Sequence, residues 1–420
     1  MKPKILTTLQ TYNGLIFRAD ILAGMSVAMV ALPLSLAIAI ASGASPAQGL
    51  VTAIVAGFMI SLLGGSKVQI GGPTGAFIVV VYGVIAEHGY NGLVLATFMA
   101  GVILLIGGFL RAGRLMRFVP EPVINGFTIG IAVIIATSQL KDLLGLSVDT
   151  VPAEFFGKVD ALWGARDSIN FAALSIGIVT MILIVSFRRL APKLPGLIVA
   201  VAVTSAVVAV MALSVDTIHS RFGDLPNSLP LPTLPEVSLE RVSELLPSAF
   251  VIAFLAGIES LLSAMVADRM IQGHHRPNAE LLAQGAANIG SSLFGGLPAT
   301  GAIARTATNV RAGGKTPVAG LVHAVTILVV MLIAAPLAGF LAMPALAGLL
   351  ILTAWNMSEP HRWVSYLKER RSDQFLLVLT LVLTVVADLT VAIGVGVAVG
   401  LALRLQRRDV PPSDWDVPSR

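Results

Sequence analysis

The chain has 420 residues, of which 56% are hydrophobic and only 12% are charged. Soluble domains carry roughly 25% charged residues. With a mean hydropathy of +0.88, the composition excludes a water-soluble fold and predicts an all-α polytopic membrane protein. The chain contains no cysteine, which removes disulfides and thiolate metal or redox chemistry. Because no metal cluster, nucleophile triad or cofactor motif is found, we expect no cofactor, no metal and no enzyme.

The formal net charge of +5 does not indicate a nucleic-acid partner. Basic residues such as Arg111, Arg114 and Arg117 occupy short connections between apolar runs, whereas the connection 215–246 is rich in Asp and Glu. Cytoplasmic loops of membrane proteins carry this excess of Lys and Arg. We therefore expect a multi-pass protein in the lipid bilayer of a bacterial inner membrane, with both termini in the cytoplasm.

Apolar runs separated by polar or Gly/Pro-rich breaks predict fourteen membrane segments. In chain order the segments are residues 20–41, 48–63, 74–87, 93–110, 121–140, 169–187, 196–213, 248–267, 279–292, 300–311, 316–335, 343–356, 373–388 and 390–405. An odd number of segments in each half places the second half upside down relative to the first, so a seven-plus-seven inverted repeat is expected.

Three short sequences recur in the same order in the two halves. The pairs are Ala47–Gly49 with Ala283–Gly285, Ser61–Gly65 with Ser292–Gly296, and Pro73–Ala76 with Pro298–Ala302. The offset falls steadily from 236 to 231 to 226 residues, as small loop deletions in duplicated halves would produce. Chance recurrence in a chain with 40 Gly and 23 Pro is the alternative.

The third of these repeats begins two segments that are too short to span a bilayer. Before them, residues 68–70 and 293–297 have the character of short extended pieces, and we expect these two strands to pair with each other, because backbone groups at membrane depth need partners. Two half-helices then begin near the midplane, and helix N-termini attract anions. The expected substrate-binding residues are Thr74, Gly75, Ala76, Phe77, Gly301, Ala302, Ile303 and Ala304. Thr74 and its counterpart Thr300 are expected either to cap these helices or to contact the ligand.

Arg305 lies five residues into the second half-helix. A charged side chain inside the membrane is energetically unfavourable, so its presence indicates a function. Here Arg305 would add positive potential to the same substrate site. The alternative is an arginine that extends toward the cytoplasmic edge, where Arg311 and Lys315 are expected.

Glu259 interrupts the apolar run 250–267 near its middle. A desolvated carboxylate favours its protonated form, so Glu259 is the candidate for a coupling proton, with Ser263 one turn further as a supporting residue. The alternatives are a structural hydrogen bond or a permanent ion pair with Arg305.

At this point the sequence resembles the SulP family of anion transporters, also called solute carrier family 26. The resemblance spans nearly the whole chain. It rests on the motifs Asp20–Gly24, Ala31–Pro33, Gly72–Gly75, Pro120–Phe127, Gly301–Thr306 and Gly313–Thr316. It implies a uracil-permease-like fold with two short strands before half-helices 3 and 10, elevator-like movement of a core domain against a gate domain, and a homodimer.

The resemblance also implies the domain boundaries. Residues 1–405 would form the transport domain, with a core of segments 1–4 and 8–11 (about 20–110 and 248–335) and a gate of segments 5–7 and 12–14 (about 121–213 and 343–405). Residues 406–420 would be a cytoplasmic tail in place of the STAS domain that usually ends this family, so we expect a bacterial member that lacks it naturally or by truncation.

Two departures from the family pattern bear on the substrate. Pro33 is followed by Leu34 rather than by the Gln of many sulfate-type members. The resemblance to sodium-coupled bicarbonate members would place Asp where this chain has Glu259 and Thr where it has Ile303. We therefore expect proton-coupled symport of a small anion, with carboxylates such as fumarate first and sulfate or bicarbonate behind them. An uncoupled anion channel or exchanger and a nucleobase permease of the same fold are the alternatives.

Overall fold

The structure is a computed structural model that describes residues 2–114, 120–148, 151–191, 194–387 and 389–406. The helices are α1 (Ile5–Thr8), α2 (Gly14–Ala41), α3 (Pro46–Leu63), α4 (Ile78–Phe109), α5 (Glu121–Leu144), α6 (Phe155–Gly164), α7 (Phe171–Leu190), α8 (Gly196–Val210), α9 (Ile218–Phe222), α10 (Leu239–Ile271), α11 (Pro277–Leu293), α12 (Ile303–Arg311), α13 (Val318–Gly339), α14 (Met343–Met357), α15 (Trp363–Tyr366), α16 (Arg371–Val386) and α17 (Leu389–Gln406). The strands are β1 (Gly71–Gly72) and β2 (Thr300–Gly301).

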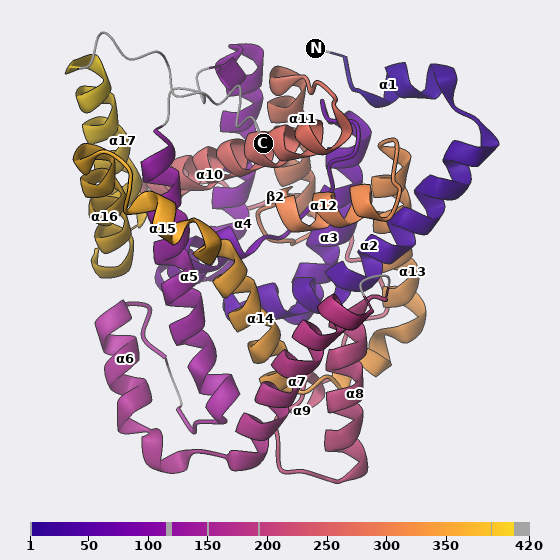
Figure 1. Cartoon of the computed structure of the whole chain (residues 1–420), viewed down its shortest axis with the longest axis vertical. Coiled ribbons are helices and arrows are strands. Elements are labelled where there is room, and N and C mark those ends of the chain that lie inside the picture. The colour runs from indigo at the N-terminus through magenta and orange to yellow at the C-terminus, as the bar shows by residue number, and fades with distance from the viewer. Residues whose placement is uncertain (1, 115–119, 149–150, 192–193, 388, 407–420) are drawn as a thin grey trace.

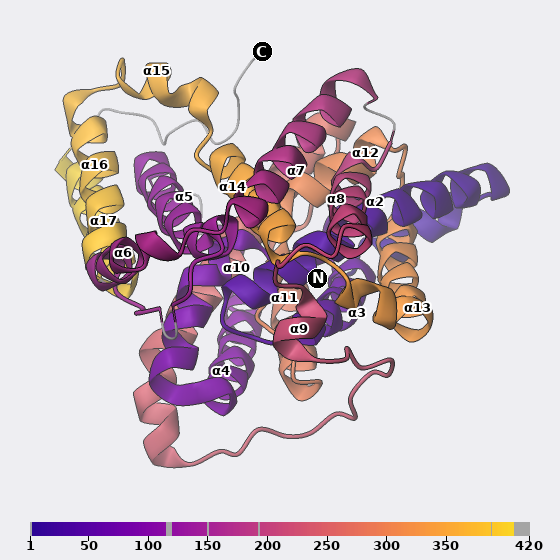
Figure 2. The ribbon, with the colours of Figure 1, turned by 90° about the horizontal axis from the view of Figure 1, so that it is seen from below.

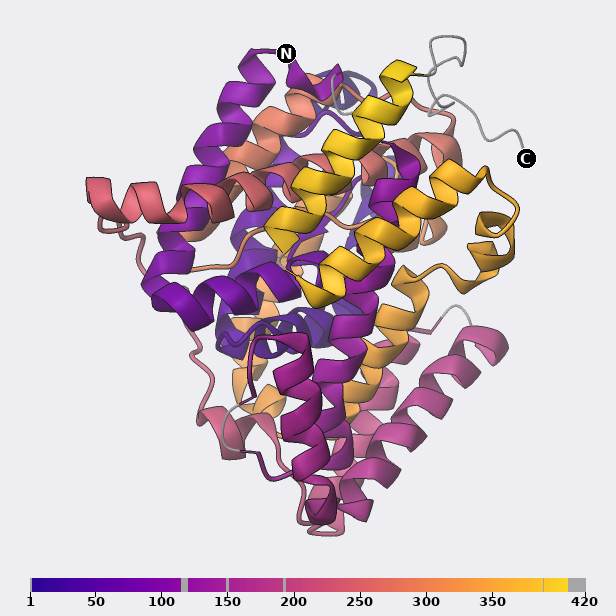
Figure 3. The ribbon, with the colours of Figure 1, turned by 90° about the vertical axis from the view of Figure 1, so that its left-hand side faces the viewer.

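The helices pack as two sets. The first set contains α2, α3, α4 and α10 to α13, whose members contact one another extensively, and the second contains α5, α7, α8, α14, α16 and α17. Figure 2 shows the two sets side by side, with α16 and α17 on the far side of the molecule from α13. Figure 3 shows the pair α16 and α17 beside α5. The short helix α1 lies at one end of the molecule and α6 and α9 lie at the other (Figure 1).

Contacts between helices recur with the two halves exchanged, as an inverted repeat requires. Helix α4 packs on α11 as α13 packs on α3, and α4 packs on α10 as α13 packs on α2. In the second set, α5 packs on α16 as α14 packs on α7. Within the described residues, seven helices are long and apolar enough to cross a membrane.

The residues of the expected segments lie in helices, although some bounds differ. Segments 74–87 and 93–110 are two helices within α4, as expected, separated by a kink at Gly89, whose φ of 68° is a conformation that suits glycine. The segment expected at 248–267 is longer, because α10 already begins at Leu239 inside the polar connection. The tail 406–420 lies outside the described residues except for Gln406.

The two expected strands pair with each other in antiparallel register, with Gly71 opposite Gly301 and Gly72 opposite Thr300. They lie just after the expected extended pieces, and Leu293 is the last residue of α11 rather than part of a strand. The segment expected from residue 300 therefore begins as a helix only at Ile303. The pair joins the two halves at the centre of the first set.

Two fully buried carboxylates tie the first set together. Asp20 accepts bonds from the backbone N–H groups of Lys315 and Thr316, at 2.7 and 3.1 Å. Glu280 accepts bonds from the N–H groups of Gly65 and Ser66, at 2.8 and 3.1 Å. Each carboxylate thus satisfies backbone donors of a connection from the other half, which fixes the start of α13 and the chain that leads into β1.

Helices α4 and α11 approach so closely that only glycine fits at their crossing. A Cβ atom at Gly101 would lie 2.8 Å from the carbonyl oxygen of Gly285, and a Cβ atom at Gly285 would lie 2.8 Å from that of Gly101. Small residues allow this approach between membrane helices.

Gly101→Ala is expected to push α4 and α11 apart and to destabilise the protein by about 1–3 kcal/mol, the usual cost of overpacking. Gly83→Ala on the same helix is the matched control, because a Cβ atom there meets nothing within 4 Å. Thermal unfolding in detergent should show a lower midpoint for Gly101→Ala only. A parental midpoint for Gly101→Ala would contradict the close crossing.

Candidate functional site

A cavity of about 1460 Å³ lies between the two sets of helices. The first set contributes residues of α2, α10, α12 and the chain before α4, and the second contributes α5, α14, the last turn of α7 and the first turn of α8. The first turns of α5 and α8 and the last turns of α7, α10 and α14 line the cavity, so its mouth lies at that end of the molecule, opposite α6.

The first expected half-helix begins at this cavity. Thr74, Gly75 and Ala76 line the wall, whereas Phe77 is buried behind it. The helix starts as a 3-10 turn, Gly75–Phe77, and continues as α4. The Thr74 side chain makes no capping bond, which corrects the capping alternative; its hydroxyl instead donates to Oε2 of Glu259 over 3.3 Å. The N–H groups of this first turn remain without helical partners, as at every helix start.

The second half-helix begins on the opposite side of the strand pair. Ala302, Ile303 and Ala304 line the cavity, and Ile303 is 42% exposed there. Thr300 and Gly301 are buried in β2 and do not line the cavity. The Thr300 hydroxyl donates to the carbonyl of Ala256 over 2.8 Å, so Thr300 supports the strand and neither caps the helix nor reaches the cavity.

Glu259 lies on α10 at the junction of the two half-helices, half-buried and lining the cavity. The next residue, Ser260, is buried and belongs to a network behind the wall: it accepts a bond from Gln69 at 2.9 Å and donates to Glu280 at 3.0 Å. Ser263 is also buried behind the wall, 3.2 Å from the hydroxyl of Thr306. Ser263 therefore braces α12 against α10 and has no contact with the cavity.

Arg305 is 1% exposed, although it belongs to the cavity wall. Its Nη2 donates to the Ser35 hydroxyl over 3.0 Å and to the carbonyl of Pro73 over 3.1 Å, while Nε and Nη1 have no hydrogen-bond partner. The guanidinium lies against Gly72, where a Cβ atom would be 2.3 Å from Nη1. Arg305 is therefore held inside the protein and does not extend to the edge. No ion pair joins it to Glu259 in the described structure.

An unpaired buried cation needs negative charge to offset its desolvation. The charge of Arg305 stands directly behind the wall that carries the two helix N-termini, so all three raise the potential of the cavity. At the mouth, Arg362 bonds Glu121 at 2.6 Å and Glu359 at 3.0 Å. The other lining arginines, for which no acidic partner is found in the described part of the chain, are Arg188, Arg269 and Arg311. Arginines thus outnumber glutamates in the described cavity lining, by five to three, and the excess of positive charge favours an anion.

Three residues of the site were not anticipated from the sequence. Ser35, which orients Arg305, is one hydroxyl in an apolar run and gives no signal. Met357 carries its sulfur 3.0 Å from the Cβ position of Gly75 and so sets the clearance between the two sets; a methionine in an apolar segment also gives no signal. Glu280 was detectable, because a carboxylate inside an expected membrane segment is unusual.

Comparisons with known proteins agree with this geometry. Residues 17–380 match the model of the sulfate permease family. The Bacillus subtilis protein YvdB, which its name provisionally calls a sulfate transporter, is 43% identical over 370 residues, covering 88% of this chain and 70% of that protein. The bicarbonate transporter BicA of Picosynechococcus is 34% identical over 345 residues, covering 79% of this chain and 60% of that protein. The chain thus spans between 60% and 70% of the length of these two relatives.

A solved structure agrees as well. The transmembrane domain of a cyanobacterial BicA superimposes with a TM-score of 0.81 at 30% identity, covering 91% of this chain and 98% of that domain. The proteins matched are membrane transporters, which fits a chain with a polytopic fold and a deep anion-attracting cavity. The chain belongs to the sulfate permease family of anion transporters.

Proposed function

We propose that the protein is a secondary active transporter that carries a small anion together with a proton. The observation that carries this proposal is the 3.3 Å contact between the Thr74 hydroxyl and Glu259, which puts an ionisable carboxyl group inside an anion-attracting cavity. An ionised Glu259 repels an anion in the same cavity, and a protonated Glu259 does not. Anion binding and proton binding are therefore thermodynamically linked, and each raises the affinity for the other.

The substrate class follows from the donors. Two helix starts and one buried guanidinium select negative charge, and the cavity offers Ile303 rather than an oxygen ligand for sodium at the position where the family resemblance would place Thr. A carboxylate such as fumarate is our first candidate, because Leu34 departs from the pattern of sulfate-type members and Glu259 and Ile303 depart from that of sodium-coupled bicarbonate members. Sulfate and bicarbonate, the anions in the names of the two relatives, are the competing substrates.

Transport would follow from movement of the first set, as the core, against the second set, as the gate. Residues of the half-helices belong to the core, so the substrate site would travel with it, and the wall that it slides past includes Met357 and Ile135 of the gate. Such rigid-body movement around a site at a repeat interface is a known transporter mechanism. We assign the mouth with its basic residues to the cytoplasm, together with both termini, in a bacterial plasma membrane, and we expect a homodimer.

Two other functions differ in measurable ways. An uncoupled channel or exchanger would pass anions without accumulating them against a gradient. A nucleobase permease would resemble this fold but use two carboxylates, and Arg305 stands where the second would be expected.

Replacing Arg305 by Met is expected to weaken anion binding by about tenfold or more, since each ~1.4 kcal/mol of lost electrostatic stabilisation is a factor of ten. Arg305→Lys keeps the charge and should retain most of the affinity. Arg166→Met, at an exposed residue after α6 that does not line the cavity, is the control with little effect. Titration calorimetry with fumarate, sulfate and bicarbonate measures all three. If Arg305→Met binds every anion as the parental protein does, the guanidinium does not contribute to the site.

Glu259→Gln is expected to abolish uptake driven by a pH gradient in proteoliposomes while anion exchange continues, because an amide cannot load or release a proton. The matched control is Glu244→Gln, an exposed residue near the start of the same helix, which should transport normally. Radiolabelled fumarate uptake with and without the gradient checks this. Gradient-driven uptake that survives in Glu259→Gln would remove the proposed coupling role.

A further inference from the structure

A buried lysine lies at the end of the molecule opposite the cavity mouth. Lys158 of α6 is 3% exposed, and its ammonium group donates to the Ser138 hydroxyl over 2.8 Å. The same nitrogen lies 5.3 Å from the ring centroid of Tyr82, a cation–π distance. No carboxylate pairs with Lys158 among the described residues. Lysine is rarely buried without such a partner, so this contact requires an explanation.

Tyr82 belongs to the first set of helices, and its partners lie in the connection that carries α6, a helix that packs on α5 and α16 of the second set. Tyr82 lies on α4, beyond the half-helix start, and a Cβ atom at Gly43 would lie 3.4 Å from its ring. Its hydroxyl donates over 2.6 Å to the carbonyl of Val151, in the connection that carries α6. In the described part of the chain, no other side-chain hydrogen bond joins the first set to the second set or to this connection.

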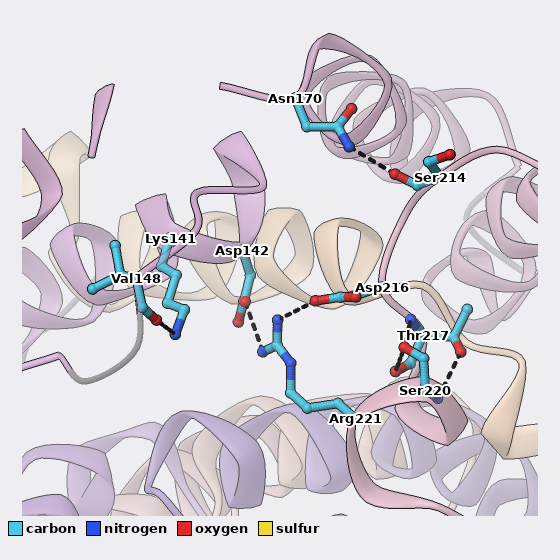
Figure 4. Close-up of polar contacts among 9 residues, drawn as sticks. All are labelled: Lys141, Asp142, Val148, Asn170, Ser214, Asp216, Thr217, Ser220 and Arg221. Carbon is cyan, nitrogen blue, oxygen red and sulfur yellow. Dashed lines mark hydrogen bonds and ion pairs between the residues drawn. The ribbon is translucent and has the colours of Figure 1, made fainter. Parts of the chain in front are cut away.

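The connection that carries α6 is anchored to the second set. Lys141, near the end of α5, donates to the carbonyl of Val148 over 2.6 Å, as Figure 4 shows. The same view shows Arg221 bonded to Asp142 at 2.7 Å and to Asp216 at 3.0 Å, which ties the region of α9 to α5. The Lys141 contact joins α5 to the connection that follows it, so it does not have to change when the two sets move relative to each other.

We propose that Lys158, Tyr82 and Val151 form a latch that closes the cavity at the α6 end and must open for the substrate site to reach that face. This inference rests on the proposed movement of core against gate. The three residues make polar contacts that cross between the moving sets on the closed side, while the mouth at the other end is open. In the alternate state, the Lys158 ammonium would leave Tyr82 and regain water.

The strength of the latch suits a contact that must open and close. A net hydrogen bond contributes about 0.5–1.5 kcal/mol and a cation–π contact about 0.5–2 kcal/mol. Desolvation works against them: burial lowers the pKa of Lys158 to about 8, which means that the closed state holds the charged ammonium at a cost. The closed state is thus favoured without being locked.

Single-cysteine reporters test the latch without background, because the chain contains no cysteine. Ile135→Cys on α5 reports the closed side, since Ile135 is 1% exposed and lies 3.7 Å from the Cβ position of Gly75. Thr353→Cys reports the mouth side, since Thr353 lines the cavity. A membrane-impermeant maleimide is applied to proteoliposomes, with Asp160→Cys on exposed α6 marking the accessible face.

Lys158→Met and Tyr82→Phe are expected to speed modification of Ile135→Cys from the α6 face by roughly three- to tenfold and to slow modification of Thr353→Cys, because the population shifts toward the state open at α6. Lys141→Met, which removes a contact within the second set, should change neither rate. Tyr82→Phe keeps the ring and loses only the hydroxyl, so it remains informative if Lys158→Met folds poorly.

Parental rates at both reporters in the two latch variants would overturn the latch. So would a rise at both reporters together, since that pattern indicates loosening of the fold rather than alternation. Anion uptake measured on the same vesicles separates the two proposals. Opposite changes in the modification rates of the two reporters, without any anion transport, would keep the latch and reject the transport function. Anion transport with unchanged modification rates would keep the transport function and reject the latch.

Discussion

The pairing of β1 with β2 is the constraint on which the rest of the site depends. Extended backbone at membrane depth must find partners inside the protein. Each strand finds them in the other half, with Gly71 opposite Gly301. Backbone groups that flank the strands also find their partners in the other half. The N–H of Ala302 donates to the carbonyl of Ile70 over 2.8 Å, and the N–H of Ile70 donates to the Thr306 hydroxyl over 3.1 Å. Because a helix begins directly after each strand, this pairing also sets where both helix N-termini meet.

The charges of the site are arranged around that junction. Arg305 is buried against β1 without a carboxylate, which is stable only where negative charge compensates it or where other interactions of the fold offset the cost. Glu259 lies across the junction and is not paired with it. Separation of these two groups leaves the guanidinium charge unneutralised and the carboxyl group at the cavity wall, as the proposed anion binding and proton exchange require. A permanent ion pair between them would have cancelled both properties.

Much of this architecture could be predicted from the sequence because Gly, Pro and polar residues mark the places where apolar segments are interrupted. Repeated Gly, Pro and Thr residues indicated two half-helices and two paired strands, and both are present. The register of the strands was missed, since two-residue strands have no periodicity to read. The partner of Thr74, the role of Ser35 in orienting Arg305 and the contact of Lys158 with Tyr82 depend on packing between distant segments, which a single sequence does not encode locally.

The most direct measurement is an experimental structure with a heavy anion bound. Crystals soaked separately in selenate and in bromofumarate locate selenium and bromine by anomalous scattering. The account predicts an anion between the starts of the two half-helices, within hydrogen-bond distance of backbone N–H groups near Gly75 and Ile303 and beside Glu259. An anion bound only at the mouth arginines, with the junction of the half-helices unoccupied in both soaks, would contradict it.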